Sequence, residues 1–418
     1  MRIMLINHYA GSPYMGMEFR PYYMAAEWAK AGHEVTIIAA DHSHLRLANP
    51  KISRNFEEQD IDGITYCFVA TPDYDNNLTG RSRNVMAFVR KLYFEASTLA
   101  QKYRPEVVIA SSTYPFDSFA AHRIAGQTGA PVVFEVHDLW PLTQIELYNY
   151  KPNHPMVLTL SYAQRQAVTK AEAVVSILPF ADRYFKEQGL PVREYVHIPN
   201  GIRTKHKSVP PPQQHLQLIR HKREKGRFVV LYCGSIGPSN ALDELVMAAK
   251  QLEDRAVVVL IGNGGYKINL KRIAREHCIS NLLFLDSVQR DQLPGLMELA
   301  DCLYLGVKDS PLYRYGVGMN KIYDYMLAGK PILAALSAAN DPVAEAGCGL
   351  TVPPGDPEEI ALGIRQMMGL DASARQRMGQ RGYEYVTQHH DYRVLAQQFL
   401  GVLEQAVKRK ASQPQEPA

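Results

Sequence analysis

The chain has 418 residues, of which 46% are hydrophobic and 21% are charged. This composition is typical of a folded globular protein and excludes wholesale disorder, and the length favours two domains of about 200 residues each. The net charge of +4 is too small for the dense basic face of a nucleic-acid-binding protein, so no nucleic-acid partner is expected.

The first predicted elements are a strand over 2–7, a helix that follows Pro21 and ends at Gly32, and a strand over 35–40. Two strands joined by a helix are expected to be parallel. Further short apolar strands are predicted at 107–110, 132–136, 173–177 and 195–199. Together they predict one doubly wound domain over residues 1–204.

A polar stretch over 205–225 is interpreted as a connection at the domain boundary, because its three consecutive prolines cannot join a central strand. Apolar runs then restart at 228–232, 257–261, 282–285, 302–305 and 331–335. They predict a second doubly wound domain over 205–389. A last helix is predicted near 392–408, and the polar residues 411–418 are expected to be disordered.

The cysteines and the apolar segments indicate the compartment. Five cysteines lie far apart without a CxxC pair, which favours reduced thiols over disulfides or a zinc site. The first residues lack the apolar core of a signal peptide, and no apolar run reaches the ~20 residues that span a bilayer. We therefore expect a cytoplasmic protein, with a place at the inner face of the plasma membrane left open.

Ligands of open α/β sheets bind beyond the carboxyl ends of the strands, so the loops that follow strands are the candidate sites. After the strand that ends at Tyr232, four small polar residues precede a helix predicted from about Leu242: Gly234, Ser235, Gly237 and Asn240. Glycine N–H groups at a helix N-terminus suit a diphosphate, with serine or asparagine as caps. A simple tight turn is an equally good interpretation here, and at Gly262 it is the favoured one.

The most specific stretch is a glycine-rich loop that contains Gly318 and leads into a short helix with Asn320, Lys321 and Asp324. A lysine near a helix N-terminus indicates an anionic partner. Asp324, three residues further on, lies on the same helical face and suits ribose hydroxyls. The alternative is a pair of solvated surface charges.

In the first half of the chain, His137, Asp138 and Trp140 follow a predicted strand. A histidine at this edge can orient or polarise a bound sugar. The alternative is a structural histidine with its hydrogen bonds satisfied. Asn200 and Gly201 are interpreted as a turn.

Between Asn76 and Arg104 the chain carries six basic residues and one glutamate, interleaved with apolar residues. Two interpretations of 81–104 are equally good. One is a basic amphipathic helix on anionic lipid, and the other is a core-packed helix with a solvated basic edge.

Seven motifs in order resemble the GT-B glycosyltransferases of family 4, and more narrowly the bacterial fucosamine-transferase-like (WbuB-like) branch. They are Phe19-Arg-Pro-Tyr-Tyr, Gly32-His-Glu-Val-Thr, Ser43-His-Leu-Arg, His137-Asp-Leu-Trp-Pro, Ile198-Pro-Asn-Gly-Ile, Asn320-Lys-Ile-Tyr-Asp-Tyr-Met-Leu-Ala-Gly-Lys-Pro and Ala346-Gly-Cys-Gly-Leu. The resemblance implies two Rossmann-like domains facing across a cleft, with a C-terminal helix (about 390–410) that crosses back to the first domain.

The resemblance further implies a retaining, metal-independent and cofactor-free transfer from a nucleoside-diphosphate sugar, UDP favoured over GDP, to a hydroxyl of a lipid-linked glycan. His137 and Lys321 would be catalytic. The donor would be bound by Gly234, Ser235, Gly237, Asn240, Gly262, Gly318, Asn320, Asp324 and Tyr325. Acceptor-side candidates are Gly16, Arg20, His44, Arg46 and Asp138.

The chain departs from the family pattern at two places. It has Gly316 and Asp324 where many members carry two glutamates, and Pro238, Ser239 and Asn240 where many carry arginine and lysine. Two alternatives are a nucleotide-sugar epimerase of the same double fold and a non-catalytic binding subunit.

Overall fold

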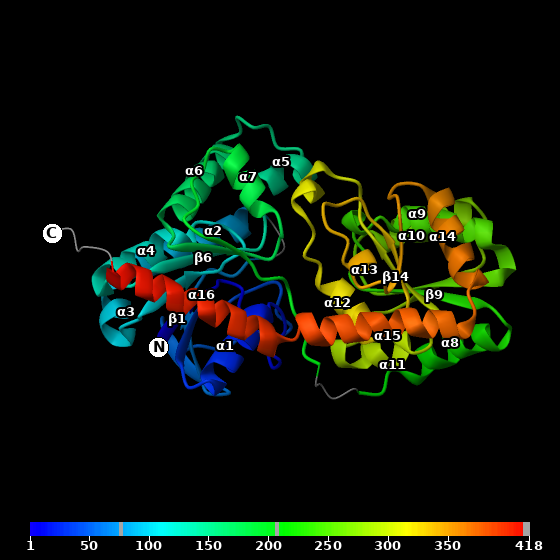
Figure 1. Ribbon diagram of the computed structural model, residues 1–418, viewed down its shortest axis with the longest axis horizontal. Coiled ribbons are helices and arrows are strands. Elements are labelled where there is room, and N and C mark those ends of the chain that lie inside the picture. Colours follow the sequence, from blue (N-terminus) through cyan, green and yellow to red (C-terminus); the bar gives the residue numbers. More distant parts are fainter. Residues whose placement is uncertain (75–77, 205–208, 413–418) are drawn as a thin grey trace. The chain divides into compact units, whose positions relative to one another are not determined.

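The computed structural model describes residues 1–74, 78–204 and 209–412. The chain forms two units, each built around one sheet (Figure 1). Unit 1 comprises Met1–Asn200, Tyr315–Gly318 and the chain from Tyr392 onward, and unit 2 comprises Gly201–Arg314 and Met319–Asp391. A short loop from the second half of the sequence, Tyr315–Gly318, therefore lies with unit 1.

Unit 1 holds an eight-stranded sheet in the order β3-β4-β2-β1-β5-β6-β7-β8. Neighbouring strands are parallel except β3 and β4, which pair antiparallel. The strands are β1 (Arg2–Ile6), β2 (Glu34–Ala40), β3 (Glu57–Ile61), β4 (Ile64–Val69), β5 (Val107–Ala110), β6 (Val132–Val136), β7 (Ala173–Ser176) and β8 (Tyr195–His197).

The two strands β3 and β4 are absent from the sequence prediction. The β3 segment, Glu-Glu-Gln-Asp-Ile, is polar and only partly covered, as expected at a sheet edge. Gly63, with φ of +80°, makes the tight turn into β4. The prediction relied on apolar runs separated by helices. The strand β3 is polar, and a tight turn rather than a helix joins it to β4.

Helices cover the sheet of unit 1. They are α1 (Arg20–Lys30), α2 (Leu78–Phe94), α3 (Ala96–Tyr103), α4 (Asp117–Thr128), α5 (Leu142–Tyr148), α6 (Pro155–Lys170), α7 (Ala181–Glu187) and α16 (Tyr392–Ser412). The predicted return of the C-terminal helix is confirmed within unit 1, because α16 packs on α1: Trp28 Nε1 donates to the carbonyl of Ala396 at 2.9 Å, and its ring meets Phe399 edge-on. Since α16 ends at Ser412, residues 411 and 412 are helical rather than disordered; 413–418 lie outside the described residues.

Unit 2 holds a six-stranded sheet in the order β11-β10-β9-β12-β13-β14, with every neighbouring pair parallel. The strands are β9 (Phe228–Cys233), β10 (Ala256–Ile261), β11 (Leu282–Leu285), β12 (Cys302–Gly306), β13 (Ile332–Ala335) and β14 (Gly349–Val352). The first five were predicted. The edge strand β14 was not, since its sequence Gly-Leu-Thr-Val is short and mostly half-buried or exposed.

The helices of unit 2 are α8 (Gln213–Glu224), α9 (Leu242–Leu252), α10 (Lys267–Glu276), α11 (Leu293–Met297), α12 (Asn320–Leu327), α13 (Pro342–Glu345), α14 (Pro357–Gly369) and α15 (Ala372–His389). The interpretation of 205–225 as a connection is wrong from Gln213 onward. The helix α8 forms there because Leu216 and Ile219 share one face and are buried, while the other positions are polar except for the exposed Leu218. Residues 205–208 lie outside the described residues.

In both sheets the strand order changes direction, at β1/β5 in unit 1 and at β9/β12 in unit 2. Loops after such neighbouring strands turn to opposite faces, which is where doubly wound folds bind ligands. Among the described residues, no helix combines the length and the hydropathy needed to cross a bilayer.

Candidate active site

Three strands of unit 1 end in polar residues at one edge of the sheet. Asn7 and His8 follow β1, Ser111 and Ser112 follow β5, and His137 follows β6. Parallel pairing puts these residues side by side. Direct contacts confirm this, since the Asn7 amide donates to the Ser111 carbonyl at 2.6 Å, and Ser111 Oγ lies 3.2 Å from His137 Nε2.

His137 is held by a buried carboxylate. Its Nε2 lies 3.5 Å from Oε2 of Glu135, and the Ser111 hydroxyl donates to the same oxygen at 2.5 Å. The other oxygen of Glu135 accepts from Nε of Arg20 at 2.9 Å. Glu135 and Arg20 are 2% and 1% exposed, so they form an ion pair inside unit 1. Since Nε2 faces this network, Nδ1 is the ring nitrogen left for a ligand.

The charges in this network favour a protonated histidine. Burial would lower the pKa of His137, but the hydrogen bond and the charge of Glu135 outweigh burial and raise the pKa above its usual 6.5. Burial would likewise raise the pKa of Glu135, and Arg20 together with His137 reverses that shift and holds the carboxyl ionised. His137 can therefore donate a hydrogen bond through Nδ1 to an oxygen of a bound ligand.

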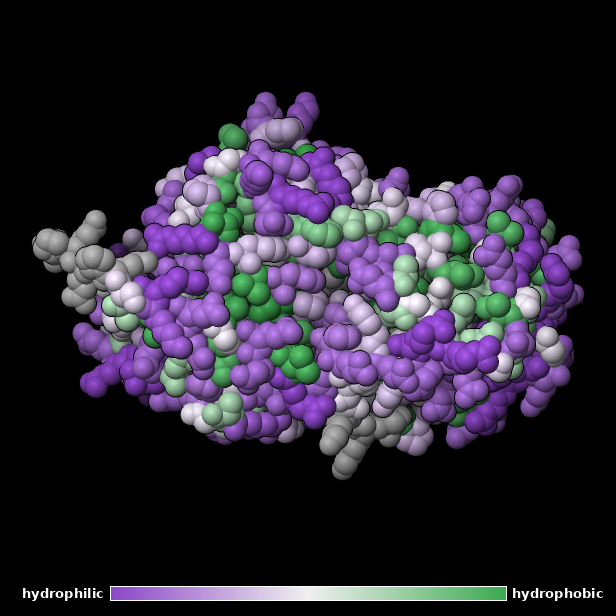
Figure 2. All heavy atoms as spheres, in the orientation of Figure 1, coloured by the Kyte–Doolittle hydropathy of each residue, from purple (hydrophilic) through white to green (hydrophobic). Residues whose placement is uncertain are grey.

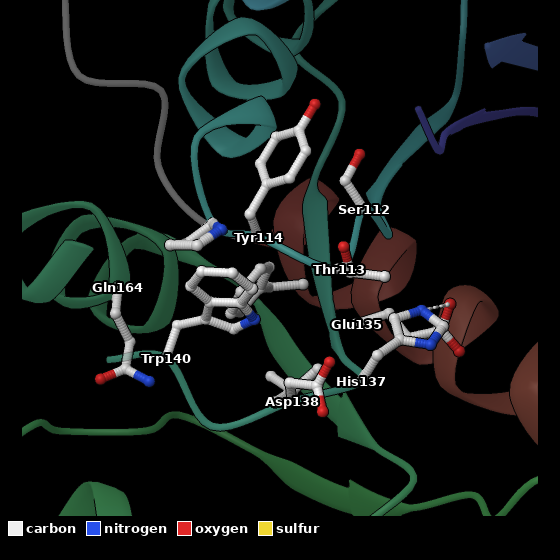
Figure 3. A pocket seen from close by; sticks show the side chains of 11 residues that line it. Ser112, Thr113, Tyr114, Glu135, His137, Asp138, Trp140 and Gln164 are labelled. Carbon is white, nitrogen blue, oxygen red and sulfur yellow. Dashed lines mark ion pairs between the residues drawn. The ribbon is translucent and has the colours of Figure 1, made fainter. Parts of the chain in front are cut away.

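A small cavity lies beside His137 (Figure 3). It is lined by Thr113, Asp138 and Trp140 among others, and offers about 10 Å³ to a water-sized molecule. That is space for one water and too little for a sugar ring. Trp140 Nε1 and Thr113 Oγ1 are buried and have no hydrogen-bond partner among the described residues, so they are the groups such a water would bridge. Asp138, by contrast, is exposed at this edge and is available to a larger ligand.

The acceptor-side candidates divide into structural and accessible residues. The guanidinium of Arg46 donates to the carbonyls of Ala10 at 3.0 Å and Ala40 at 2.7 Å, and Arg46 is 7% exposed. Gly16, with φ of +99°, pairs with Arg46 through a backbone bridge. Arg20 donates to the carbonyls of Ile198 and Pro199 in addition to Glu135. These three residues hold loops together, whereas His44 and Asp138 retain accessible surface.

In unit 2, Lys321 lies in the first turn of α12 and points to the loop after β9. Its ammonium donates to the Tyr232 hydroxyl at 2.7 Å and to Oδ1 of Asn240 at 3.1 Å. The lysine is half-buried, and burial lowers its pKa from 10.5 to about 8. Asp324, three residues further along α12, accepts from Arg290 at 2.7 Å, and its role with Lys321 at one ligand stays a prediction.

Two glycines let the backbone of this loop approach closely. Gly234 has φ of +147°, and a Cβ there would lie 2.9 Å from Cε of Lys321. Gly262 has φ of +155°, and a Cβ there would lie 1.9 Å from the carbonyl oxygen of Gly234. The simple-turn interpretation of Gly262 is therefore incomplete, because this glycine holds the Gly234 loop against β10.

The remaining donor-side candidates surround this loop. Asn240 does not cap α9, because a short 3-10 helix (Pro238–Asn240) precedes that helix and Ala241 occupies the cap position without a side-chain bond. Its amide instead donates to the Ser235 carbonyl at 3.1 Å, while Gly237 precedes the 3-10 turn. Tyr325 is buried and its hydroxyl accepts from the Cys233 N–H at 2.9 Å. Asn320 begins α12 and is exposed.

Gly318 lies apart from that group, because it packs on unit 1. Its carbonyl accepts from the Asn200 amide at 2.7 Å, and a Cβ there would lie 2.9 Å from the Ile177 carbonyl oxygen. Asn200 therefore does more than form a turn: it fastens the glycine-rich loop that precedes α12.

Sequence reasoning missed three residues of these networks: Glu135, Tyr232 and Arg290. Glu135 had a signal, since it is the only charged residue within the apolar strand β6 and is followed at the second position by His137. Tyr232 and Arg290 had none, because their partners Lys321 and Asp324 are far away in the sequence.

Comparisons with known proteins agree with this architecture. Residues 15–201 match the Glycosyl transferase 4-like domain and residues 216–385 match the Glycosyl transferases group 1 domain. The chain is 24% identical over 289 residues to the putative colanic acid biosynthesis glycosyl transferase WcaI of Escherichia coli K12, across 66% of this chain and 69% of that protein.

Two solved structures show the same fold. Sucrose-phosphate synthase from Thermosynechococcus elongatus matches with a TM-score of 0.73 and 15% identity, covering 97% of this chain and 99% of that one. Anabaena HepE in complex with UDP-glucose matches with a TM-score of 0.67 and 17% identity, covering 96% and 99%. With its two parallel-sheet units and its two matched domains, one of the Glycosyl transferase 4-like family and one of glycosyl transferases group 1, the chain is a GT-B glycosyltransferase.

Proposed function

We propose that this glycosyltransferase is a retaining, metal-independent enzyme that moves a hexosyl or N-acetylhexosaminyl group from a nucleoside-diphosphate donor to a hydroxyl of a lipid-linked glycan. UDP is favoured over GDP as the leaving group. The acceptor and the WbuB-like branch suggest a step of bacterial surface polysaccharide synthesis at the cytoplasmic face of the membrane. WcaI, the curated relative, is named for colanic acid biosynthesis.

The observation that supports this most is the placement of Lys321 against the glycine loop after β9. Departure of a nucleoside diphosphate develops negative charge on its terminal phosphate. An ammonium that Tyr232 and Asn240 already orient stabilises that charge without reorganisation. The N–H groups of the loop around Gly234 add further donors close to the same ammonium.

Support for UDP comes from a relative of the same fold. HepE binds UDP-glucose in its solved structure. In the present chain, Asp324 stands where the family pattern has its second glutamate, and it is the candidate for the ribose hydroxyls. Its present partner is Arg290 at 2.7 Å, so ribose binding would share or replace that ion pair.

In unit 1, the group proposed to contact the transferred sugar is Nδ1 of His137. Glu135 and Ser111 hold the other ring nitrogen, which fixes the ring orientation. A protonated Nδ1 donates a hydrogen bond to a sugar hydroxyl or to an oxygen that gains negative charge during transfer.

A lipid-linked acceptor is supported by the surface of α2. The region 81–104 is two helices, α2 and α3, rather than one. On α2, Phe88 and Leu92 are buried, whereas Met86 and Phe94 are 56% and 69% exposed. One face of α2 is thus packed in the core, and its exposed apolar side chains are compatible with the membrane-facing interpretation.

The surroundings of α2 extend this surface. Arg123 of α4 lies over the ring of Tyr93 of α2 at 4.3 Å, and Phe119 of α4 stacks on Tyr162 of α6. On α6, Leu158 and Tyr162 are exposed, and Figure 2 shows apolar groups among hydrophilic ones over this helix. The helices α2, α4 and α6 together carry seven lysines and arginines and one acid, the fully buried Asp117. This combination suits an anionic lipid surface.

Transfer itself is the decisive test. The protein is incubated with candidate nucleotide sugars, with and without lipid-linked acceptor and with a chelator present. Acceptor-dependent release of nucleotide with retained anomeric configuration is expected. Epimerised donor without acceptor would favour an epimerase, binding without turnover would favour a non-catalytic subunit, and loss of activity in the chelator would remove metal independence.

A further inference from the structure

At the carboxyl edge of the unit 1 sheet, Arg81 has terminal guanidinium nitrogens that no described residue occupies. The guanidinium groups of Arg20 and Arg46 donate to backbone carbonyls, and that of Arg20 also donates to Glu135. Arg81, in the first turn of α2, is half-buried; its Nε donates to the Tyr9 hydroxyl at 3.3 Å and its Cζ lies 5.6 Å from the centre of that ring. Its two terminal nitrogens have no hydrogen-bond or ion-pair partner among the described residues.

A second donor lies on the other side of Tyr9. His44 meets the Tyr9 ring edge-on with 5.8 Å between ring centres, and its Nδ1 lies 2.6 Å from the Tyr74 hydroxyl. Burial lowers the pKa of His44, and the positive charges of Arg81 and His42 lower it further. The charge of Arg81 therefore influences the pKa of His44, although the two residues come from different elements of the chain.

The charges around this position favour an anion. His42 adds a third basic group, and its carboxylate partner is Asp73 at 3.3 Å. A further acid near Arg81 is Asp138, whose pKa burial and the charge of Glu18 raise and the charges of His137 and Arg81 lower. A guanidinium whose two terminal nitrogens have no partner among the described residues can bind a tetrahedral oxyanion through two parallel hydrogen bonds.

We propose that Arg81 and His44 bind a phosphate group of the acceptor, with Tyr9 and Tyr74 as positioning residues. The proposal rests on the proposed function and adds that the acceptor is recognised through its phosphate. The position of Arg81 supports this, because the same helix presents Met86 and Phe94 to the surroundings. A phosphate that joins a glycan to a lipid would put its charge at Arg81 and its chain toward that apolar surface.

The anion site is tested without any transfer reaction. The His44 ring is titrated by NMR in the full-length protein, with and without inorganic pyrophosphate, in the wild type, in Arg81→Gln and in the control Arg54→Gln, which removes an exposed arginine of the same unit. Without pyrophosphate, Arg81→Gln should raise the pKa of His44, because a positive neighbour is lost and His42 remains in both proteins.

Pyrophosphate should raise the pKa of His44 in the wild type and in Arg54→Gln, and should have little effect in Arg81→Gln. An equal response of all three proteins would overturn the assignment of Arg81. No response in the wild type would overturn the anion site altogether.

Kinetics then identify the source of the phosphate. Three acceptors with one glycan are compared: the lipid pyrophosphate, the water-soluble glycan phosphate and the glycan with a neutral aglycone. Arg81→Gln should lower kcat/KM for both phosphorylated acceptors by about 10- to 100-fold, the range for a lost charged hydrogen bond, and should leave the neutral acceptor and the donor KM unchanged.

Two other outcomes contradict the proposal. A loss of kcat/KM confined to the lipid pyrophosphate would indicate that Arg81 binds the membrane surface and not the acceptor phosphate. An equal loss of kcat/KM with all three acceptors would indicate a structural role for Arg81. If the wild type transfers to none of the three, the proposed function fails, whereas the pyrophosphate titration still decides on the anion site.

Discussion

The ammonium of Lys321 and the hydroxyl of Tyr232 lie 2.7 Å apart, although 89 positions separate them in the sequence. The same ammonium lies 4.1 Å from the centre of the Tyr232 ring. The aromatic ring and hydroxyl hold the charge at the carboxyl end of β9, and Asn240 fixes it from a second direction. Lysine orientation in unit 2 is thus settled before any ligand binds.

Replacement of Lys321 by alanine should reduce kcat by about 10²–10³-fold, the usual cost of one missing donor to a developing oxyanion. Thermal stability should change little, because the Tyr232 hydroxyl keeps its hydrogen bond to the Ser235 carbonyl and Asn240 is only half-buried. Steady-state kinetics with saturating donor measure the effect, and Lys250→Ala serves as control for loss of an exposed lysine in α9, the helix that follows the same loop. A normal kcat in Lys321→Ala would remove the lysine from the mechanism.

Nucleotide binding should depend on pH through the same residue. Burial lowers the pKa of Lys321 to about 8, so the ammonium deprotonates as the pH rises through that value. If binding requires the charged form, the affinity for UDP weakens above pH 8 and approaches a tenfold loss per pH unit. Isothermal titration between pH 7 and pH 9 measures this slope. Lys321→Arg, which stays charged, should flatten it.

Apolar runs were sufficient to predict eleven of the fourteen strands in the described residues, since buried parallel strands need continuous hydrophobic sequence. Two of the three that were missed, β3 and β14, are edge strands, where one side is open and polar residues are tolerated. The third, β4, is apolar and mostly buried, but a tight turn and not a helix separates it from β3. The helix α8 was missed because a proline run obscured the apolar positions that follow it. Local patterns therefore predicted the apolar strands that helices separate, and they missed strands that are polar or follow a tight turn.

Site residues show a similar limit. His137, Lys321 and Asp324 could be found because each follows a strand or a glycine loop. Their orienting partners could not, since sequence spacing says nothing of the contact between Arg290 and Asp324. The burial of Arg20 and Arg46 was also hidden: both resemble surface ligands in the sequence, and only three-dimensional contacts reveal that backbone carbonyls occupy them.

Removal of the charge of Glu135 should lower the pKa of His137. Two opposing effects act on the imidazole, burial that lowers its pKa and Glu135 that raises it. In Glu135→Gln, burial and the charge of Arg20 remain and act against the weaker effect of Glu18, so the pKa of His137 should fall below 6.5. NMR titration measures the shift, and the acidic pH range in which kcat depends on His137 should move with it.

Glu172→Gln is the matched control for that experiment. Glu172 is a buried carboxylate of the same unit and accepts from Arg193 at 2.7 Å, but it precedes β7 and has no contact with His137 in the described residues. This variant should leave the titration of His137 unchanged. An unshifted pKa of His137 in Glu135→Gln would show that the carboxylate does not hold the imidazole in its charged form.

Loss of Arg20 should destabilise the protein strongly, because the buried Glu135 would lose its guanidinium partner and keep only His137, 3.5 Å away, as a countercharge. Breaking a buried pair from one side typically costs ~3–5 kcal/mol in the free energy of unfolding. Arg20 holds the pKa of Glu135 below its usual value, so the stability from this carboxylate is present above the unfolded pKa near 4.5 and is lost as the pH falls further. The difference in the free energy of unfolding between wild type and Arg20→Ala should therefore be larger at pH 7 than at pH 4.

Urea unfolding at both pH values measures this difference. Arg20→Ala combined with Glu135→Gln should recover part of the loss, because no carboxylate charge then remains buried. Equal destabilisation at the two pH values would mean that Arg20 acts through its contacts with the Ile198 and Pro199 carbonyls rather than through the charge of Glu135.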